Sequence, residues 1–288
     1  MPVERGKPPH NVQVLQRWVG EHAKATGVAQ QRLQRWISFM VVAAALERVR
    51  DEDDDPVFAL KGGVAMELRL GLDARATKDY DTAFRERSGD MLDRLDQAIA
   101  DTYGDFKITR TPPRTIRNTD AIQLDLKLAY RGRSWGTVKL EVAPTEGDAG
   151  QEIDRVPAIP LGPFGLSGPD DVACVAVRYQ IAQKLHACTE VFAEPPPNDR
   201  FRDLSDVLML EGLIDDLARV RDACVEIFAL RAKHSWPPTV TVFDGWPEQY
   251  AALAAELDFE PRNVHDAAAA VQGLVDAIDA AGFAPKRA

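Results

Sequence analysis

The sequence predicts an α/β (α+β) fold with N-terminal helices, then a lobe built on a mixed β-sheet, then a mostly helical C-terminal lobe. Three observations predict this order. Helical periodicity opens the chain, short strands alternate with helices between residues 57 and 143, and helical patterns follow residue 170. The stretch 144–169 is rich in Pro and Gly, so we place the boundary between two domains, 1–165 and 166–288, near its end.

Periodicity and turn residues define the elements of the first half. Apolar residues at three- and four-residue steps indicate helices over 11–24 and 29–50, and an acidic run followed by Pro56 ends the second helix. A short apolar strand and a Gly-Gly turn come next, and a short helix then ends at Gly71. The elements expected after residue 56 are a strand at 57–60, a helix at 64–70, a strand at 79–84 and a helix at 88–101.

The second half begins with a predicted β-hairpin. Apolar side chains alternate with polar ones in both 121–130 and 137–143, and the connecting turn contains two glycines. Beyond the stretch rich in Pro and Gly, the apolar spacing indicates helices only. These helices are expected at 170–191, 203–212, 214–232 and 247–282.

The composition is that of an ordinary globular chain of 288 residues, 45% hydrophobic and 28% charged. The longest apolar run, 39–46, is too short to cross a bilayer, and the start lacks the apolar segment of a secretory signal. The three cysteines show no CxxC spacing, which is typical of reduced thiols, so we expect a cytoplasmic protein without membrane contact. The net charge of −10 does not support nucleic-acid binding over the whole surface, but it does not exclude a local basic groove.

The segment 60–81 combines features suited to phosphate chemistry. At Gly62 and Gly63 the absence of a Cβ atom lets backbone N–H groups approach a phosphate, and the following helix N-terminus adds favourable dipole charge. Asp79 and Asp81 are two residues apart on the next strand, so their side chains project from one face. They can therefore hold two Mg²⁺ ions roughly 3.5–4 Å apart, an arrangement suited to in-line displacement at phosphorus.

A third carboxylate on a neighbouring strand would complete such a site. Glu141 qualifies, because the alternation that turns Val138, Leu140 and Val142 towards the core turns Glu141 to the other face. Asp125 has the equivalent position on the partner strand of the hairpin. Both residues are therefore candidates, and Glu141 is the one we prefer.

Two blocks of the sequence resemble the AbiEii/AbiGii family of nucleotidyltransferase toxins, which includes the MenT-type toxins of mycobacteria. The first block comprises 60–65 (LKGGVA) and 75–81 (RATKDYD), and the second comprises 184–187 (KLHA) and 200–206 (RFRDLSD). The segment 138–142 (VKLEV) resembles the family's strand that supplies the third acidic residue. Val64 departs from the family pattern, which usually has Thr or Ser after the two glycines.

The resemblance implies a nucleotidyltransferase fold of the DNA-polymerase-β type, with the substrate NTP in the cleft between two lobes. It also implies a toxin restrained by an antitoxin encoded beside it, and some family members attach nucleotides to the 3′ end of tRNA. The implied catalytic residues are Asp79, Asp81, Glu141, Lys184 and Asp203, and the first three would bind the two Mg²⁺ ions. The implied nucleotide-binding residues are Lys61, Gly62, Gly63, Val64 and Lys184.

Several residues in and around these blocks also have plain structural interpretations. Lys184 lies at the margin of an apolar helical stripe, where a lysine is ordinarily a surface cation, but the resemblance makes it a ligand of the triphosphate. Asp203 and Asp206 would complement the dipole at a helix N-terminus, and the resemblance places Asp203 in the site. His186 is expected to pack between helices, and Trp135 near the hairpin tip either stacks on a base or packs within the protein.

Three hypotheses follow for the function. An RNA-modifying toxin is favoured by the resemblance and by a group of arginines, namely Arg110, Arg114, Arg117, Arg131 and Arg133. An enzyme of the same fold that modifies a protein or a small molecule is favoured by the acidic net charge. A non-catalytic NTP-binding partner protein is disfavoured, because Asp79, Asp81 and Glu141 are all present.

Overall fold

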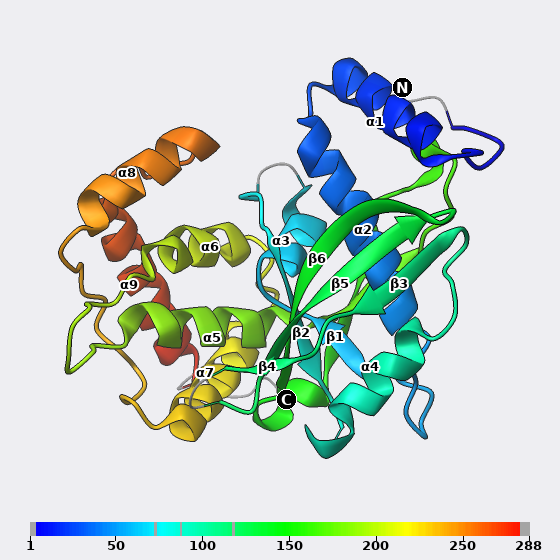
Figure 1. Cartoon of the computed structure of the whole chain (residues 1–288). Helices are drawn as coiled ribbons and strands as arrows, with labels where there is room; N and C mark the ends of the chain where they lie inside the picture. The colour runs from blue at the N-terminus through cyan, green and yellow to red at the C-terminus, as the bar shows by residue number, and fades with distance from the viewer. Residues whose placement is uncertain (1–3, 72–73, 87, 117–118, 283–288) are drawn as a thin grey trace. The chain divides into compact units, whose positions relative to one another are not determined.

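The computed structural model describes residues 4–71, 74–86, 88–116 and 119–282 (Figure 1). The chain forms two compact units that are not consecutive in sequence. The first comprises Met1–Arg69, Ala76–Thr145 and Ile153–Cys174, and the second comprises Leu70–Arg75, Glu146–Glu152 and Val175–Ala288. The sequence suggested one boundary near residue 165, whereas here the chain passes from one unit to the other several times.

One mixed sheet of eight strands organises the first unit. Its strands are β1 (Phe58–Leu60), β2 (Asp79–Phe84), β3 (Phe106–Arg110), β4 (Arg114–Thr115), β5 (Ile122–Tyr130), β6 (Arg133–Pro144), β7 (Ile153–Pro157) and β8 (Asp171–Val175). They lie in the order β3-β5-β6-β2-β1-β8-β7, and β4 pairs with β5. β2 is parallel to β6 and β1 is parallel to β8, whereas β5 is antiparallel to both β3 and β6. The predicted α/β fold class is confirmed.

Helices cover one face of this sheet. The helices of the first unit are α1 (Val12–Thr26), α2 (Gln30–Leu46), α3 (Gly62–Leu70) and α4 (Met91–Ile99), with short 3-10 helices at Ser88–Asp90 and Gly162–Phe164. Every residue of α2 from position 37 to 46 is buried, and the rings of Phe39 and Tyr80 meet with their centroids 5.5 Å apart. Burial of a large apolar side chain contributes roughly 1.5–3 kcal/mol, so α2 is a principal support of the sheet.

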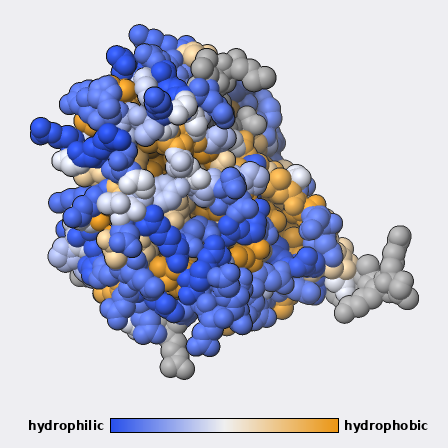
Figure 2. All heavy atoms as spheres, turned by 90° about the vertical axis from the view of Figure 1, so that its right-hand side faces the viewer, coloured by the Kyte–Doolittle hydropathy of each residue, from blue (hydrophilic) through white to orange (hydrophobic). Residues whose placement is uncertain are grey.

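The other face of β3, β5 and β6 is polar. Along β5, Leu124 and Leu126 are buried while Asp125 and Lys127 are exposed. This alternation follows from the two-residue period of a strand, since one face packs on α2 and the other meets solvent. Figure 2 shows one side of the molecule as mainly hydrophilic, with smaller apolar patches between the polar side chains.

The second unit is helical. Its helices are α5 (Val177–Thr189), α6 (Phe201–Glu211), α7 (Leu217–Arg231), α8 (Trp246–Leu257) and α9 (Val264–Ala281), with a short 3-10 helix at Gly147–Gly150. α5 packs against α6 and α7, and α9 packs against α6, α7 and α8. Within the described residues, no helix is both long enough and apolar enough to cross a membrane.

The predicted helices over 170–191 and 247–282 need correction. Residues Asp171–Val175 form the buried strand β8, because a short apolar run that is buried on both faces has no period that separates a strand from a helix. The final helix is two helices, α8 and α9, separated by a segment that contains Pro261. β3, β4 and β7 were not predicted, and each is short and lies towards an edge of the sheet.

Candidate active site

The paired aspartates lie on β2, and the sheet register sets a third carboxylate beside them. β2 and β6 are parallel, and Asp79 lies opposite Lys139. Two residues further on, Asp81 lies opposite Glu141. Tyr80 between the aspartates is fully buried against α2, so both aspartates project from the opposite face of the sheet. Asp79 is exposed there, and Asp81 and Glu141 are half-buried.

The competing carboxylate, Asp125, lies one strand further away. It is on β5, opposite Lys139, and β6 separates it from β2. Neighbouring strands are about 4.8 Å apart, so the backbone of Asp125 is about twice as far from β2 as that of Glu141. The geometry of the sheet therefore favours Glu141 as the third carboxylate.

The turn between β1 and α3 brings Gly62 against Asp81. Gly62 has φ of +63°, a conformation that favours glycine, and a Cβ atom built there would overlap the Asp81 carboxylate. The backbone N–H of Lys61 donates to the carbonyl oxygen of Asp81 at 2.9 Å. Gly62 is also the first residue of α3, so a helix N-terminus and a carboxylate meet at this point. The former attracts phosphate and the latter attracts a cation.

A buried glutamate, which the sequence analysis missed, holds the segment that leads into β2. Glu67 on α3 is 2% exposed and accepts a hydrogen bond from the backbone N–H of Thr77 at 2.7 Å. The indole Nε1–H of Trp36 on α2 donates to the same carboxylate. A Cβ atom at Gly63 would lie 2.6 Å from Thr77, so this glycine permits the close approach. The available signal was an acidic residue within the apolar helix, because glutamate is buried only when it is paired.

In the second unit, Lys184 is buried and bound to two carboxylates. Its Nζ donates to Asp203 Oδ1 at 2.8 Å and to Asp206 Oδ2 at 2.5 Å. The Nε and Nη2 atoms of Arg75 each donate to the Asp206 carboxylate at 3.2 Å. The interpretation of Lys184 as a surface cation is therefore wrong, since burial of an ammonium group is tolerated where carboxylates pair with it.

The charges in this cluster support one another. Burial opposes ionisation of Asp206, but Lys184 and Arg75 more than offset that effect and hold the pKa of Asp206 below its usual range. Burial also opposes the charge on Lys184, yet the two carboxylates raise its pKa above the usual value. Asp206 is 1% exposed and lies beyond the first turn of α6, so its main partners are Lys184 and Arg75 rather than the helix dipole. Arg75 belongs to the first block of the family resemblance, but no role was predicted for it.

Three other expectations concern single side chains. Val64 is 2% exposed and belongs to the hydrophobic core, so only its backbone is available to a phosphate. Trp135 does not present its ring to a base, because it is 4% exposed and its Nε1–H donates to Ser38 Oγ at 3.0 Å. His186 packs within its unit, as predicted, with its ring 4.9 Å from that of Phe228, and burial lowers its pKa to about 4.

Local ion pairs divide the arginine group of residues 110–133. Arg110 binds Asp96 at 2.6 Å, and Arg131 binds Asp105 at 2.8 Å. The other members are Arg114 and Arg133, which are exposed, and Arg117, which lies outside the described residues. Since two of the charges are paired with carboxylates, this group offers less attraction to a polyanion than the sequence suggested.

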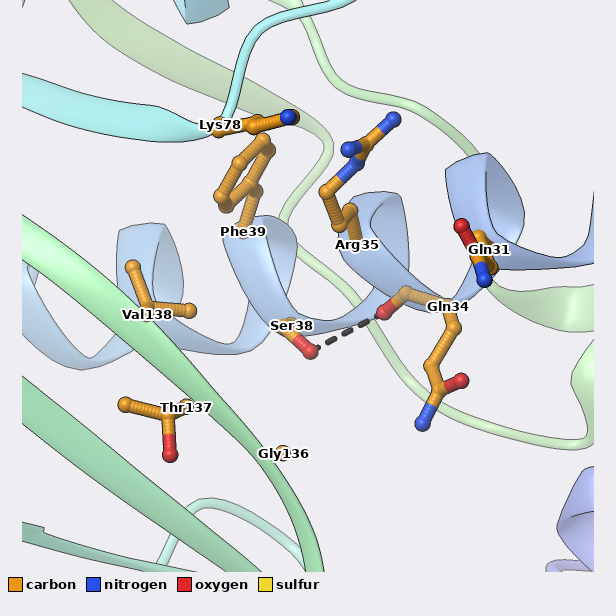
Figure 3. A pocket seen from close by; sticks show the side chains of 9 residues that line it. All are labelled: Gln31, Gln34, Arg35, Ser38, Phe39, Lys78, Gly136, Thr137 and Val138. Atoms are coloured by element: carbon orange, nitrogen blue, oxygen red, sulfur yellow. Dashed lines mark hydrogen bonds between the residues drawn. The ribbon is translucent and has the colours of Figure 1, made fainter.

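A pocket of about 250 Å³ lies between α2 and the start of β6 (Figure 3). Phe39 and Val138 supply apolar lining, and Arg35 and Lys78 supply positive charge. Figure 3 shows both cations on the same side of α2. The aspartates of β2 project from the opposite face of the sheet, so this pocket is distinct from the carboxylate site.

The donor set around β2 suits a hard divalent cation. Asp79, Asp81 and Glu141 supply oxygen ligands, which Mg²⁺ prefers. The Asp79 carboxylate lies 3.6 Å from Lys139 Nζ. Among the described residues, no three acidic, histidine or cysteine side chains are gathered as in an assembled metal centre. The residue types and the register therefore fit Mg²⁺, and an ion would take the place of Lys139 as the partner of Asp79.

A mixed sheet with paired carboxylates beside a Gly-Gly helix N-terminus is the arrangement of a nucleotidyltransferase. The chain matches the family model described as "Nucleotidyl transferase AbiEii toxin, Type IV TA system" over residues 44–280. It therefore belongs to the AbiEii family of toxin–antitoxin nucleotidyltransferases. The predicted resemblance and the predicted enzyme class are both confirmed.

A solved toxin structure supports the same fold. The chain is similar to the nucleotidyltransferase toxin MenT4 from Mycobacterium tuberculosis, with a TM-score of 0.56 and 17% identity over 92% of this chain and 89% of that chain. It also matches an H. pylori structure described as a candidate nucleotidyltransferase, with a TM-score of 0.45 and 17% identity over 88% of this chain and 97% of that chain. A comparison with curated proteins gives no match.

Proposed function

We propose that this enzyme transfers a nucleoside monophosphate from an NTP to the 3′ end of tRNA, using two Mg²⁺ ions. The observation that carries the proposal is the register of β2 and β6, which sets Asp79, Asp81 and Glu141 on one face beside Gly62. The choice of tRNA rests on the family resemblance, since some members modify that acceptor. A cognate antitoxin restrains the activity, and the protein acts in the cytoplasm.

Each residue of the first unit has a defined part in this reaction. The backbone of Lys61, Gly62, Gly63 and Val64 at the start of α3 binds phosphate oxygens. When bound, Mg²⁺ would neutralise phosphate charge at ligands supplied by the three carboxylates. Glu141 accepts the proton of the acceptor hydroxyl. The acceptor oxygen then bonds to the α-phosphorus, and the bond from that phosphorus to pyrophosphate breaks. Positioning and charge neutralisation supply most of the rate.

Lys184 has a proposed part of its own, as a ligand of the β- and γ-phosphates that Asp203 and Asp206 orient. Its two ion pairs support an oriented cation rather than a mobile one. Lys184→Met alone would leave the buried Asp203 without its cation and Asp206 with Arg75 as its remaining cation, and would destabilise the fold by roughly 3–5 kcal/mol. The better test adds Lys184→Met to Asp206→Asn and compares NTP affinity with Asp206→Asn alone. Equal affinities would remove Lys184 from NTP binding.

The reaction is tested with each α-labelled NTP, total tRNA, and three proteins. These are the wild type, Glu141→Gln and the matched control Asp125→Asn. We expect label at the 3′ end of tRNA, a loss of about 10²–10³-fold for Glu141→Gln, and near-normal transfer for Asp125→Asn. Loss of transfer in Asp125→Asn and near-normal transfer in Glu141→Gln would instead identify Asp125 on β5 as the third carboxylate. Label on protein or on a small molecule would refute the tRNA acceptor, and NTP binding without transfer would refute the enzyme.

A further inference from the structure

Three exposed lysines lie on the uncovered face of the sheet, one on each of three neighbouring strands. Lys107 is on β3, Lys127 on β5 and Lys139 on β6, and Figure 1 shows these strands side by side. All three share the face of Asp79, because each alternates with buried residues that pack towards α2. We call Lys107, Lys127 and Lys139 the lysine stripe.

The sheet register makes the lysine stripe a straight diagonal. Lys127 lies opposite Thr137 on one side, so Lys139 is its diagonal neighbour two residues along β6. On the other side Lys127 lies opposite Thr109, so Lys107 is its diagonal neighbour two residues back along β3. Diagonal neighbours are about 7–8 Å apart, so the three positions span roughly 15 Å in even steps.

The same diagonal leads to the carboxylate site. Lys139 lies opposite Asp79, and one further diagonal step across the parallel pair of β6 and β2 reaches Asp81. Lys139 Nζ is 3.6 Å from the Asp79 carboxylate. The lysine stripe therefore has an inner end at the reacting centre and an outer end at Lys107 on β3, the first strand in the order of the sheet.

The outer two lysines keep their charge available. Within the part of the chain that the structure describes, the side chains of Lys107 and Lys127 have no hydrogen bond or ion pair, in contrast to those of Arg110 and Arg131. On the uncovered face, the ionisable residues of β3, β5 and β6 are three cations and two acids, namely Lys107, Lys127, Lys139, Asp125 and Glu141. In a chain of net charge −10, these three strands therefore present a small excess of positive charge on this face, beside the carboxylates of β2.

We propose that the lysine stripe binds the phosphate backbone of the terminal nucleotides of the acceptor RNA, with the 3′ end at Asp81. The proposal rests on the proposed transferase function and names the surface that its acceptor uses. A polyanion with regularly repeated charges fits a line of evenly spaced cations. Because this line ends at the carboxylates, it suits a polymer to whose end a nucleotide is added. Lysines act as point charges, so this recognition does not depend on base sequence.

The test compares two double variants that remove the same charge. Lys107→Ala with Lys127→Ala removes the outer part of the lysine stripe. Lys7→Ala with Lys24→Ala removes two exposed lysines from the N-terminal region of the same unit. The affinity for a single-stranded RNA that ends in 3′-CCA is measured at several salt concentrations, together with NTP affinity. A single strand loses about 0.7 of slope in log K against log salt for each phosphate contact.

We expect the stripe variant to lower that slope by about 1.4 and to raise KM for tRNA at least about tenfold at low salt, while NTP affinity and kcat stay unchanged. The control variant should behave as the wild type. Equal slopes for the two variants would overturn the proposal. Displacement of the RNA by poly-glutamate as effectively as by unlabelled RNA would also overturn it, because the surface would then be assigned to an acidic protein. RNA affinity is measured without turnover, so it tests the lysine stripe independently of the reaction. The variants can therefore refute the lysine stripe while transfer to tRNA is still observed, and a failure of transfer to tRNA does not refute RNA binding by the lysine stripe.

Discussion

At the scale of single residues, the clearest constraint is the space at Gly62. Its positive φ is shared by Gly71, which has φ of +64° and, among the described residues, no atom within 4 Å of a built Cβ. The two glycines therefore share a backbone conformation and differ in the side chain that a methyl group would meet. Gly62 has the Asp81 carboxylate there, and Gly71 has open space.

This difference gives a matched pair of variants. Gly71→Ala should destabilise the protein by about 1–2 kcal/mol, the strain of a left-handed alanine, and leave transfer unchanged. Gly62→Ala adds the same strain and also displaces Asp81, so we expect transfer to fall by at least about 10²-fold. Thermal unfolding and initial rates measure the two effects separately. Equal transfer by the two variants would show that the position of Asp81 does not limit the reaction.

His186 gives the pH dependence of stability. Its pKa in the folded protein is about 4, lowered first by burial and then by Arg231 and His234. In the unfolded chain the histidine takes up a proton near pH 6.5. The contribution of neutral His186 to the free energy of unfolding is therefore complete above that pH and is lost as the pH falls towards 4. The free energy of unfolding should therefore decrease between about pH 6.5 and 4.

The corresponding measurement is urea unfolding at half-unit steps from pH 7.5 to 4. His186→Phe should flatten the decrease, because phenylalanine keeps the aromatic packing with Phe228 and has no proton to bind. His265→Gln, at an exposed position on α9, is the control and should leave the profile unchanged. A profile of His186→Phe that coincides with the wild type would assign the pH dependence to other groups.

At the scale of elements, Glu67 joins α2, α3 and the segment before β2. It accepts hydrogen bonds from Thr77 and Trp36 with its two different oxygens, and a glutamine would keep only one of these acceptors. Glu67→Gln places an amide N–H against the indole N–H of Trp36, so we expect a loss of roughly 1–3 kcal/mol and a lower kcat.

Trp36→Phe removes the opposing donor, and the double variant should recover part of the loss that Glu67→Gln causes. The coupling free energy from the four proteins measures the contact directly. Urea unfolding gives the stability and single-turnover transfer gives the rate. Additive effects would mean that Glu67 and Trp36 act independently, which would contradict the role of Glu67 as the link between these elements.

Strand alternation and turn residues made much of the carboxylate site predictable. Asp79 and Asp81 follow from local patterns, which left both Glu141 and Asp125 as candidates for the third carboxylate, and the register of β2 with β6 then sets Glu141 beside the two aspartates. The buried cluster could not be derived in the same way, because Arg75 and Asp206 are 131 residues apart and no local pattern relates them. The strand β8 was missed for the related reason that a fully buried apolar run shows no period.

At the scale of the whole molecule, the second unit depends on two short segments that precede its helices in the chain and are separated from them by strands of the first unit. Leu70–Arg75 supplies Arg75 to the cluster, and Glu146–Glu152 supplies Glu146, which binds Arg231 at 2.7 Å. A fragment of residues 166–288 lacks both partners. We expect it to lose the cooperative unfolding transition, measured by circular dichroism, that the full chain shows. A fragment with a sharp transition of its own would contradict this expectation.

The interleaving of the two units also constrains how such a gene can change. Recombination usually exchanges contiguous pieces of coding sequence, and a single crossover near codon 165 would pair an Arg75 and a Glu146 from one parent with an Asp206 and an Arg231 from the other. Chimaeras of divergent relatives should therefore be inactive unless Leu70–Arg75 and Glu146–Glu152 come from the same parent as the helices of the second unit. Because the two units are interleaved along the chain, we expect the coding sequence to be inherited as one block.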